Sequence, residues 1–256
     1  MKFFQVLAHE SEELVEQAKP SLEEVIRTNS LNFTLYGLGL LLFLAVVAVF
    51  LKKTNEKVKY LLFGAITSIS VATTVYLAGS TIYLNQVSVT GGPIHWHADF
   101  EIWYCGQKVE IKDPEGFSNK VGTEVIHEHN DDRIHIEGVI LNRHDTSIGH
   151  FIEQIGGQLH QDHMAIPTEN GLLEVENGQT CDGQAGILQI FVYRTEGDSF
   201  YQQKLIGNPQ DYIISPFSQV PPGDCIIIEV DRPKDKTDKL CTFYKVAAEK
   251  GEIHGR

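Results

Sequence analysis

The chain has 256 residues, with 34 acidic and 21 basic side chains and a formal net charge of −13 at pH 7. A protein this acidic repels phosphate, so the composition argues against binding to nucleic acid. The sequence contains no dinucleotide fingerprint, phosphate-binding loop or Ser/His/Asp elbow, so the common nucleotide and serine-hydrolase sites are not indicated.

Residues 1–30 form a polar or amphipathic segment ahead of the first long apolar run. A loose helical stripe of apolar side chains runs through this segment and is interrupted by Pro20. Two interpretations stay open: an amphipathic arm that rests on the membrane or on a partner, and a frayed polar tail. His9 is not expected to belong to any site.

Two long uncharged runs follow, residues 31–51 and residues 60–84. They contain 21 and 25 residues, and about 20 apolar residues are needed to cross a bilayer. Two buried core helices are the alternative, but soluble domains rarely hold neighbouring helices of this length without a charged face. We therefore expect a transmembrane hairpin over residues 31–84, integral in membrane lipid.

The loop at residues 52–59 carries four lysines and one glutamate, whereas residues 1–30 carry three basic and six acidic side chains. Because short basic loops stay on the cytoplasmic side, the loop is expected inside and both flanking segments outside. This topology predicts a multi-pass protein of the cell membrane with its C-terminal domain on the extracytoplasmic side. An envelope protein is the kind of protein partner that this location allows.

All four cysteines follow the second run, at positions 105, 181, 225 and 241. None forms a C-x-x-C pair, so neither a thioredoxin-like site nor a zinc ribbon is indicated. In an oxidising compartment an even number of cysteines favours two disulfides, with three pairings open. Four buried free thiols are the alternative.

Residues 91–246 are predicted to form one mainly-β domain, followed by a C-terminal tail at residues 247–256. A short helix is expected at residues 147–154, with strands before and after it. That order predicts an antiparallel sandwich or an open barrel rather than a parallel βαβ sheet. The expected strands are 100–104, 108–111, 125–129, 133–139, 172–175, 187–193, 212–214, 225–230 and 243–246.

Nine of the 11 histidines lie between residues 95 and 163. Alternate side chains of a strand share a face, so each H-x-H string presents two imidazoles on one side. A single such string is more often structural, but two strings and a nearby I-H-I-E string predict a shared metal site. The proposed ligands and adjoining acceptors are His95, His97, His127, His129, His135, Asp99 and Glu137.

The register of the hairpin at residues 125–139 decides whether His135 joins the site. A four-residue loop would pair position 129 with 134 and turn His135 to the far face. A five-residue loop would pair 129 with 135 and 127 with 137, collecting three imidazoles and a carboxylate on one side. A slip of one residue flips every side chain, so both registers stay open.

Imidazole with an occasional carboxylate suits Zn(II), Cu(II), Ni(II) or non-haem Fe(II), and we expect a divalent transition metal, Zn or Cu. The chain has two methionines, one of them the initiator, which disfavours a Met-rich Cu(I) carrier. Imidazoles bind metal in their neutral form, so the affinity is expected to fall as the pH drops through about 6.5.

Four strings of the domain resemble those of membrane-anchored extracytoplasmic bacterial and archaeal proteins with an H-x-H-A-D-F opening and an I-H-I-E hairpin. The resemblance covers most of residues 91–246. It implies an extracytoplasmic domain and indicates no activity. The strings are HWHADFEIWYCG (95–106), the H-E-H…I-H-I-E-G hairpin (127–138), TSIGHFIEQIGG (146–157) and PPGDCIIIEV (221–230).

The leading interpretation is a membrane-anchored extracytoplasmic domain that binds a divalent transition metal through clustered histidines. One alternative is a structural or assembly subunit of a cell-envelope complex, in which the histidines serve packing or pH response. A second alternative is a metal-dependent enzyme, which would need an open coordination position and a base in reach. The sequence indicates no catalytic residue.

Overall fold

The computed structural model describes residues 22–51, 55–114, 117, 119–214 and 223–256. The chain divides into two compact units, Met1–Ser80 and Thr81–Arg256. Most of the predicted N-terminal segment, the loop residues 52–54 and the predicted turn residues 221–222 lie outside the described residues.

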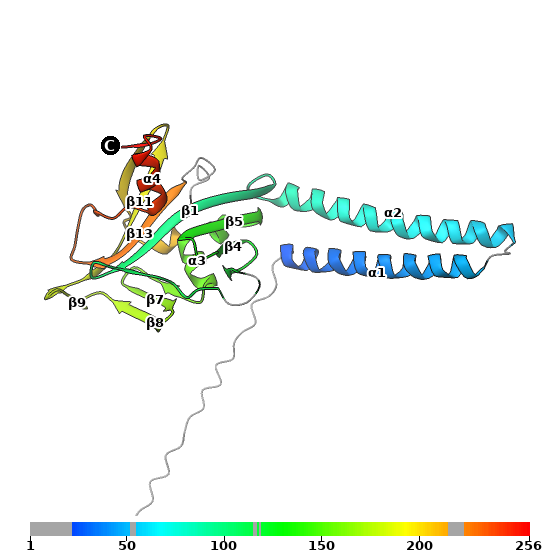
Figure 1. Ribbon diagram of the computed structural model, residues 1–256, viewed down its shortest axis with the longest axis horizontal. Helices are drawn as coiled ribbons and strands as arrows, with labels where there is room; N and C mark the ends of the chain where they lie inside the picture. Colours follow the sequence, from blue (N-terminus) through cyan, green and yellow to red (C-terminus); the bar gives the residue numbers. More distant parts are fainter. Residues whose placement is uncertain (1–21, 52–54, 115–116, 118, 215–222) are drawn as a thin grey trace, which may run out of the picture. The chain divides into compact units, whose positions relative to one another are not determined.

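Two long helices, α1 (Leu22–Phe50) and α2 (Glu56–Val87), correspond to the two uncharged runs (Figure 1). No described residue of either helix is buried, and both helices are long and apolar enough to cross a membrane. The rings of Phe33 and Tyr76 stack between the helices, with centroids 4.6 Å apart. A Cβ at Gly37 would lie 2.8 Å from the Thr73 hydroxyl, so a glycine lets the two helices approach closely here.

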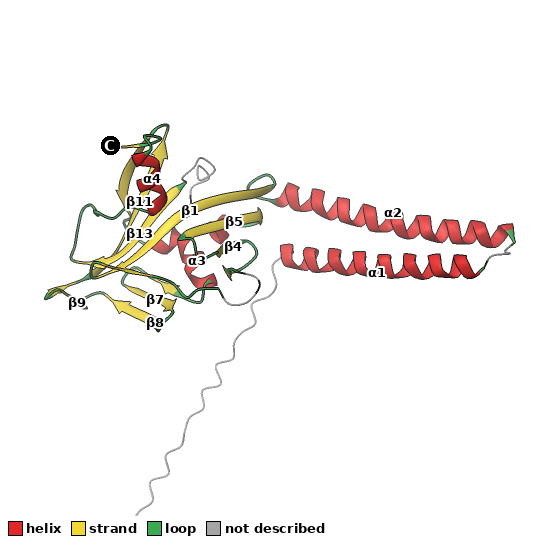
Figure 2. Ribbon diagram, viewed as in Figure 1, coloured by secondary structure: helices red, strands yellow, loops and turns green. Residues whose placement is uncertain are grey.

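The second unit is rich in strands, drawn as arrows in Figure 2. Its first half contains β1 (Pro93–Tyr104), β2 (Gln107–Val109), β3 (Val121–Gly122), β4 (Ile126–Glu128), β5 (Arg133–Val139), η1 (Arg143–Thr146), α3 (Ile148–Gln154), β6 (Gln158–Leu159), β7 (His163–Thr168) and β8 (Gly171–Glu176). Its second half contains β9 (Thr180–Cys181), β10 (Gln184–Ala185), β11 (Ile187–Glu196), β12 (Ser199–Lys204), η2 (Pro209–Asp211), β13 (Asp224–Asp231), α4 (Thr242–Glu249) and β14 (His254–Gly255).

Among the described residues, nine strands form one sheet in the order β14-β12-β11-β13-β1-β5-β4-β3, with β2 paired to β1. Strands β6, β7 and β8 form a separate three-stranded sheet, and β9 pairs with β10. The near-continuous apolar run Ile187–Tyr193 lies in β11, which is hydrogen-bonded on both sides. Such a run is typical of a strand covered on both faces.

The two faces of the large sheet pack against different elements. Even-numbered residues of β1, such as Trp96 and Phe100, join the main core with α3 and the three-stranded sheet. On the opposite face a second core lies under α4 and contains Phe191, Tyr193, Phe200, Cys225, Ile227, Cys241, Tyr244, Ala247 and Ile253. Because side chains alternate along a strand, the histidines of β1 share the face of this second core.

The prediction of two long helices followed by a mainly-β domain is confirmed, but several details are wrong. The large sheet is mixed rather than antiparallel, because β1 runs parallel to β13 and β12 runs parallel to β14. Residues 212–214 make an isolated bridge from Ile213 to Ser147 instead of a strand in a sheet.

Residues 243–246, predicted as a strand, belong to helix α4. Tyr244 and Ala247 lie three residues apart and are both buried, so one helical face packs on the second core. Gly251 has a φ of 73°, the left-handed conformation that commonly follows the end of a helix. The expected single short helix is therefore joined by a second one.

The cysteines form two disulfides, Cys105–Cys181 and Cys225–Cys241. The first joins the end of β1 to β9, and the second joins β13 to the residue that precedes α4. The linked cysteines are 76 and 16 residues apart in the sequence. Closing loops of these lengths stabilises the fold by about 3–4.5 kcal/mol each in the chain-entropy account.

Candidate metal centre

Five histidines gather where β1, β5 and β4 lie side by side, and we call them the histidine cluster: His95, His97, His127, His129 and His135. Strand β5 runs between the other two strands. His135 pairs directly with His97 of β1 and with His127 of β4. Three imidazoles therefore form a row across three neighbouring strands, with His135 at its centre.

The register of the β4–β5 hairpin differs from both predicted registers. His127 pairs with His135, which leaves a tighter turn than the four- or five-residue loop expected from the sequence. Asn130 and Asp132 have φ values of 62° and 57°. Asn and Asp tolerate this left-handed conformation better than other side chains, so the chain reverses in fewer residues. His135 still faces the same side as His127, and the expected grouping of imidazoles is kept.

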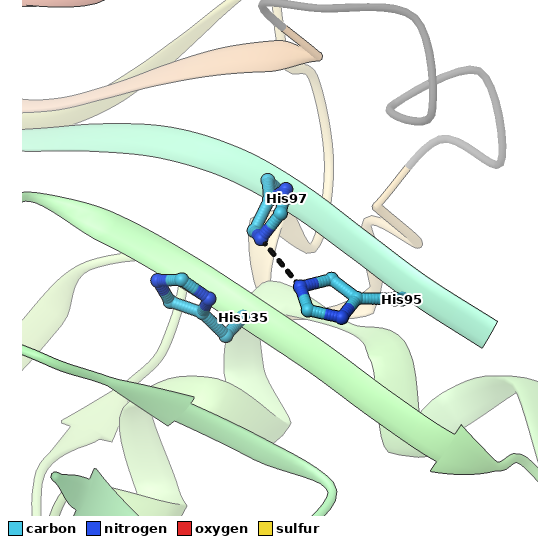
Figure 3. Close-up of side chains that lie close together, drawn as sticks. All are labelled: His95, His97 and His135. Atoms are coloured by element: carbon cyan, nitrogen blue, oxygen red, sulfur yellow. Dashed lines mark hydrogen bonds between the residues drawn. The ribbon is translucent and has the colours of Figure 1, made fainter.

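The outer triad consists of His95, His97 and His135, and each residue offers a nitrogen within 4.8 Å of the other two. Figure 3 shows the His95 and His97 rings on one strand and His135 on the next. The Nε2 atoms of His95 and His97 face each other at 2.9 Å. Ligands of a tetrahedral ion with bonds of about 2.0–2.1 Å lie about 3.3 Å apart, so a small shift of the two rings would admit an ion.

The inner triad consists of His127, His129 and His135, again with one nitrogen each within 4.8 Å of the others. The His129 ring centroid lies 4.8 Å from that of His135 and 4.7 Å from that of His127. His127 is only 3% exposed, and its Nδ1 atom has no hydrogen-bond partner within the described part of the chain. A buried nitrogen without a partner is rare in folded proteins and is a position that an ion can satisfy.

Two hydrogen bonds fix which nitrogens carry free lone pairs. The Asp131 carboxylate lies 3.2 Å from Nε2 of His135, and the Asn119 carbonyl lies 2.5 Å from Nδ1 of His129. Because a carboxylate and a carbonyl can only accept, the facing imidazole nitrogens donate. The lone pairs that remain are on Nδ1 of His135 and Nε2 of His129, and partners of this kind orient metal-binding histidines in proteins.

Burial favours the neutral form of three histidines of the cluster. It lowers the pKa of His97 to about 4, with further contributions from the neighbouring His135 and His95. Burial also lowers the pKa of His127, together with the nearby His129. The pKa of His135 is lowered by burial even though Asp131 opposes the shift. These imidazoles are neutral at pH 7, the form that binds metal.

The two predicted carboxylates occupy different places. Glu137 pairs with His95 across β1 and β5, and its Oε1 lies 3.4 Å from the His95 Nε2, so it borders the outer triad. Asp99 is buried and accepts a hydrogen bond of 2.8 Å from Nε of Arg133. Burial raises the pKa of Asp99 to about 7 against the opposing effect of Arg133. Asp99 is therefore engaged with Arg133, and it belongs to neither triad.

The sequence reading missed Asp131 and Asn119, which hold two of the imidazoles. Asp131 lies in the turn between the two strands of the hairpin. Buried Glu128 supports that turn, because its Oε1 accepts a hydrogen bond of 2.6 Å from the Asp131 backbone N–H. A carboxylate four residues before a histidine in a tight hairpin was the available signal.

The other described histidines lie apart from both triads. The ring centroids of His144 and His150 lie 6.4 Å apart, and those of His160 and His163 lie 6.1 Å apart. Neither pair belongs to a group of three potential ligands. The pair His160 and His163 thus offers a control for changes in the cluster.

Comparison with known proteins adds no function to this geometry. No protein-family model, curated protein or solved structure matches the chain. The site consists of five imidazoles. Burial lowers the pKa of three of them, and hydrogen bonds orient two.

Proposed function

We propose that the C-terminal unit is a membrane-anchored, extracytoplasmic domain that binds a divalent transition metal through the histidine cluster. The observation that carries the proposal is the row of His97, His135 and His127 across three adjacent strands. With His95 and His129 it forms two groups of three potential ligands. Three or four nitrogen ligands are what a borderline divalent ion requires.

The proposal is favoured over simple packing by the state of the imidazoles. Histidines kept only for packing usually satisfy their ring nitrogens with carbonyls, carboxylates or water. In the cluster, by contrast, Nδ1 of His127 is buried without a hydrogen-bond partner among the described residues. Leaving a buried polar atom unsatisfied costs about 1–3 kcal/mol, which an ion coordinated there would offset.

The ligand set favours a divalent transition metal such as Zn(II) or Cu(II). The four cysteines are all in disulfides, so no thiolate is available for a soft ion. Imidazole is the common ligand of Zn(II) and Cu(II), whereas Mg²⁺ and Ca²⁺ require oxygen ligands. Imidazole ligands carry no formal charge, so the bound ion keeps its full positive charge. The acidic chain around the site attracts cations.

The membrane location and its sidedness are supported by three features of the chain. Both long helices are long enough and apolar enough to cross a membrane. The loop between them is rich in lysine, and the disulfides of the second unit suit an oxidising compartment. A cysteine introduced at Asn55 should resist an impermeant thiol reagent in intact cells. Labelling at that position would contradict the proposed orientation of the helices.

A metal-dependent enzyme is a second candidate function, favoured by the number of ligands in each triad. Three protein ligands leave an open fourth position at a tetrahedral ion, where a water or substrate can bind. Glu137 at the border of the outer triad is the nearest carboxylate that could accept a proton there. Turnover of a hydrolysable ester by the metal-loaded protein, lost with Glu137→Gln while metal content is kept, would establish this second function.

Elemental analysis of the full chain tests the proposed function. The protein, purified in detergent and dialysed against Zn(II) or Cu(II) and then against metal-free buffer at pH 7.5, should retain the ion. The double variant His97→Ala, His129→Ala should lose it, whereas the control His160→Ala, His163→Ala should keep it. A parent protein that retains no ion, or equal retention by all three proteins, would contradict metal binding at this cluster.

A further inference from the structure

Building on the proposed metal binding, we infer that the two triads are alternative positions of a single ion. The outer triad receives the ion from solvent, the inner triad holds it, and His135 stays bound while the other two ligands are exchanged. His135 belongs to both triads, which is the juxtaposition that points to this arrangement.

The sharing of His135 limits the cluster to one ion at a time. Its Nε2–H donates a hydrogen bond to the Asp131 carboxylate, with the nitrogen and oxygen 3.2 Å apart. Only Nδ1 is then left with a lone pair, and one lone pair serves one ion. If both triads held an ion at once, the Nε2 of His135 would also have to bind one. It would then lose its remaining N–H proton and its hydrogen bond to Asp131.

Exposure distinguishes the roles of the two triads. The His95 side chain is 60% exposed, so an ion can reach the outer triad from solvent. The Nε2 atoms of His95 and His97 already converge at 2.9 Å, and His135 lies beside them (Figure 3). In the inner triad His127 is buried and His129 is half-buried, so an ion held there is less accessible to water and competing ligands than one in the outer triad.

The distances allow the ion to pass by stepwise exchange. The centroid of the His135 ring lies 4.6 Å from that of His97 on one side and 4.8 Å from that of His129 on the other. Bonds from the ion to His95 and His97 break as bonds to His127 and His129 form. Imidazole binds an ion through its neutral form, so exchanging one imidazole for another transfers no proton or electron and leaves the charge of the ion unchanged.

The inner triad is the better prepared of the two. Asn119 holds His129 with its Nε2 lone pair free, and Nδ1 of His127 is buried without a partner. In the outer triad, by contrast, His95 and His97 must first give up their mutual contact. Preorganised ligands lose less conformational freedom on binding, so the ion should rest in the inner triad at equilibrium.

Zinc titration and stopped-flow loading of the full chain in detergent test this inference, with Zn(II) supplied from a chromogenic chelator. The parent should bind one Zn(II) per chain. The outer variant His95→Ala, His97→Ala should still bind one Zn(II) but load roughly tenfold or more slowly, and the milder His95→Gln should show a smaller slowing of the same sign. The inner variant His127→Ala, His129→Ala should load quickly and release Zn(II) roughly 100-fold or more faster, because removing ligands should cost more than the 10–100-fold known for removing a residue that only orients a ligand.

The possible failures are distinct. Two Zn(II) ions per parent chain would overturn the single-ion inference while leaving metal binding intact, as would parent-like loading by both outer variants. No Zn(II) bound to the parent would overturn the proposed function itself. Circular dichroism and intact disulfides in each variant establish that the measured differences concern a folded domain.

Discussion

One face of the large sheet carries two regions of opposite character. Beneath α4, β11 and β13 present apolar and aromatic side chains that are almost fully buried, including Phe191 and Ile227. Along the first half of β1, with β5 and β4, the same face presents the histidine cluster, and His95 there is largely exposed. We refer to these regions as the covered half and the histidine half.

Arg133 stands at the boundary between the two halves. Its Nε donates to the buried Asp99, and its guanidinium lies 3.7 Å from the centroid of the Phe243 ring on α4. The covered half buries apolar area and contributes stability. The histidine half sets imidazoles side by side, and in the proposed function these side chains bind the ion. Changes in the two halves should therefore separate stability from metal affinity.

The largest loss of stability is expected from Tyr244→Ala in the covered half. Tyr244 is fully buried, and its hydroxyl contacts the Tyr193 and Gly223 carbonyls. Removing such a ring from a core costs about 3–5 kcal/mol, which urea unfolding would measure. Folded molecules should still bind the metal. The exposed neighbour Phe243→Ala is the control and should cost about 1 kcal/mol or less through its contact with Arg133.

The disulfide Cys225–Cys241 should come next. Both cysteines are buried in the covered half, and the bond ties β13 to the start of α4. The double variant Cys225→Ser, Cys241→Ser should lower the free energy of unfolding by about 3 kcal/mol and leave the metal content of the folded protein unchanged. Loss of metal binding at full stability would mean that the two halves are not independent.

In the histidine half, Asp131→Ala should weaken metal binding with little effect on unfolding. Asp131 orients His135, and partners of this kind are worth roughly 10–100-fold in metal affinity. Competition with a chelator measures the change. Asp132→Asn is the matched control, because Asp132 lies in the same turn but contacts Lys108 instead of a histidine. An equal loss of affinity in both variants would point to the turn as a whole.

The smallest effect is a pH dependence of the metal-free protein. The pKa of His97 is about 4 in the folded protein and 6.5 when unperturbed, so between these values the unfolded chain binds the extra proton. Stability from this group is complete above pH 6.5 and falls as the pH drops toward 4. Asp99, whose pKa is raised from 3.8 to about 7, contributes in the opposite direction, because the folded state binds its proton more tightly as the pH falls through the same range.

Thermal unfolding between pH 7 and pH 4 would separate these two groups. His97→Gln should show a shallower decline in Tm toward acid than the parent, because the loss that His97 contributes is removed while the contributions of Asp99, His127 and His135 stay. A steeper decline in the variant would contradict the assignment. The lowered pKa values of His97, His127 and His135 also shift the loss of metal to a lower pH than the value of about 6.5 expected from unperturbed imidazole.

Local patterns in the sequence predicted much of this arrangement. The uncharged runs predicted both long helices, and the alternation in each H-x-H string predicted which imidazoles share a face. Pairing between strands was less accessible, since the tight turn depends on the left-handed backbone of Asn130 and Asp132. Helix α4 was missed because Phe243 and Val246 favour strands locally, while the burial of Tyr244 and Ala247 on one face is a tertiary effect.

The central position of β5 lay beyond sequence reasoning for a similar reason. Strand β1 runs parallel to β13, more than 100 residues later in the chain, and antiparallel to β5. No local signal specifies such long-range neighbours. The two H-x-H strings were expected to lie side by side, whereas His135 in fact stands between them and belongs to both groups.

X-ray absorption spectroscopy of the full chain loaded with Zn(II) in detergent tests the central claim most directly. We predict at least three nitrogen neighbours at about 2.0–2.1 Å, with the more distant scattering that imidazole rings produce. The double variant His97→Ala, His129→Ala should lose this pattern, and His160→Ala, His163→Ala should retain it. An ion surrounded by oxygen alone, without imidazole scattering, would contradict a metal centre built from the histidine cluster.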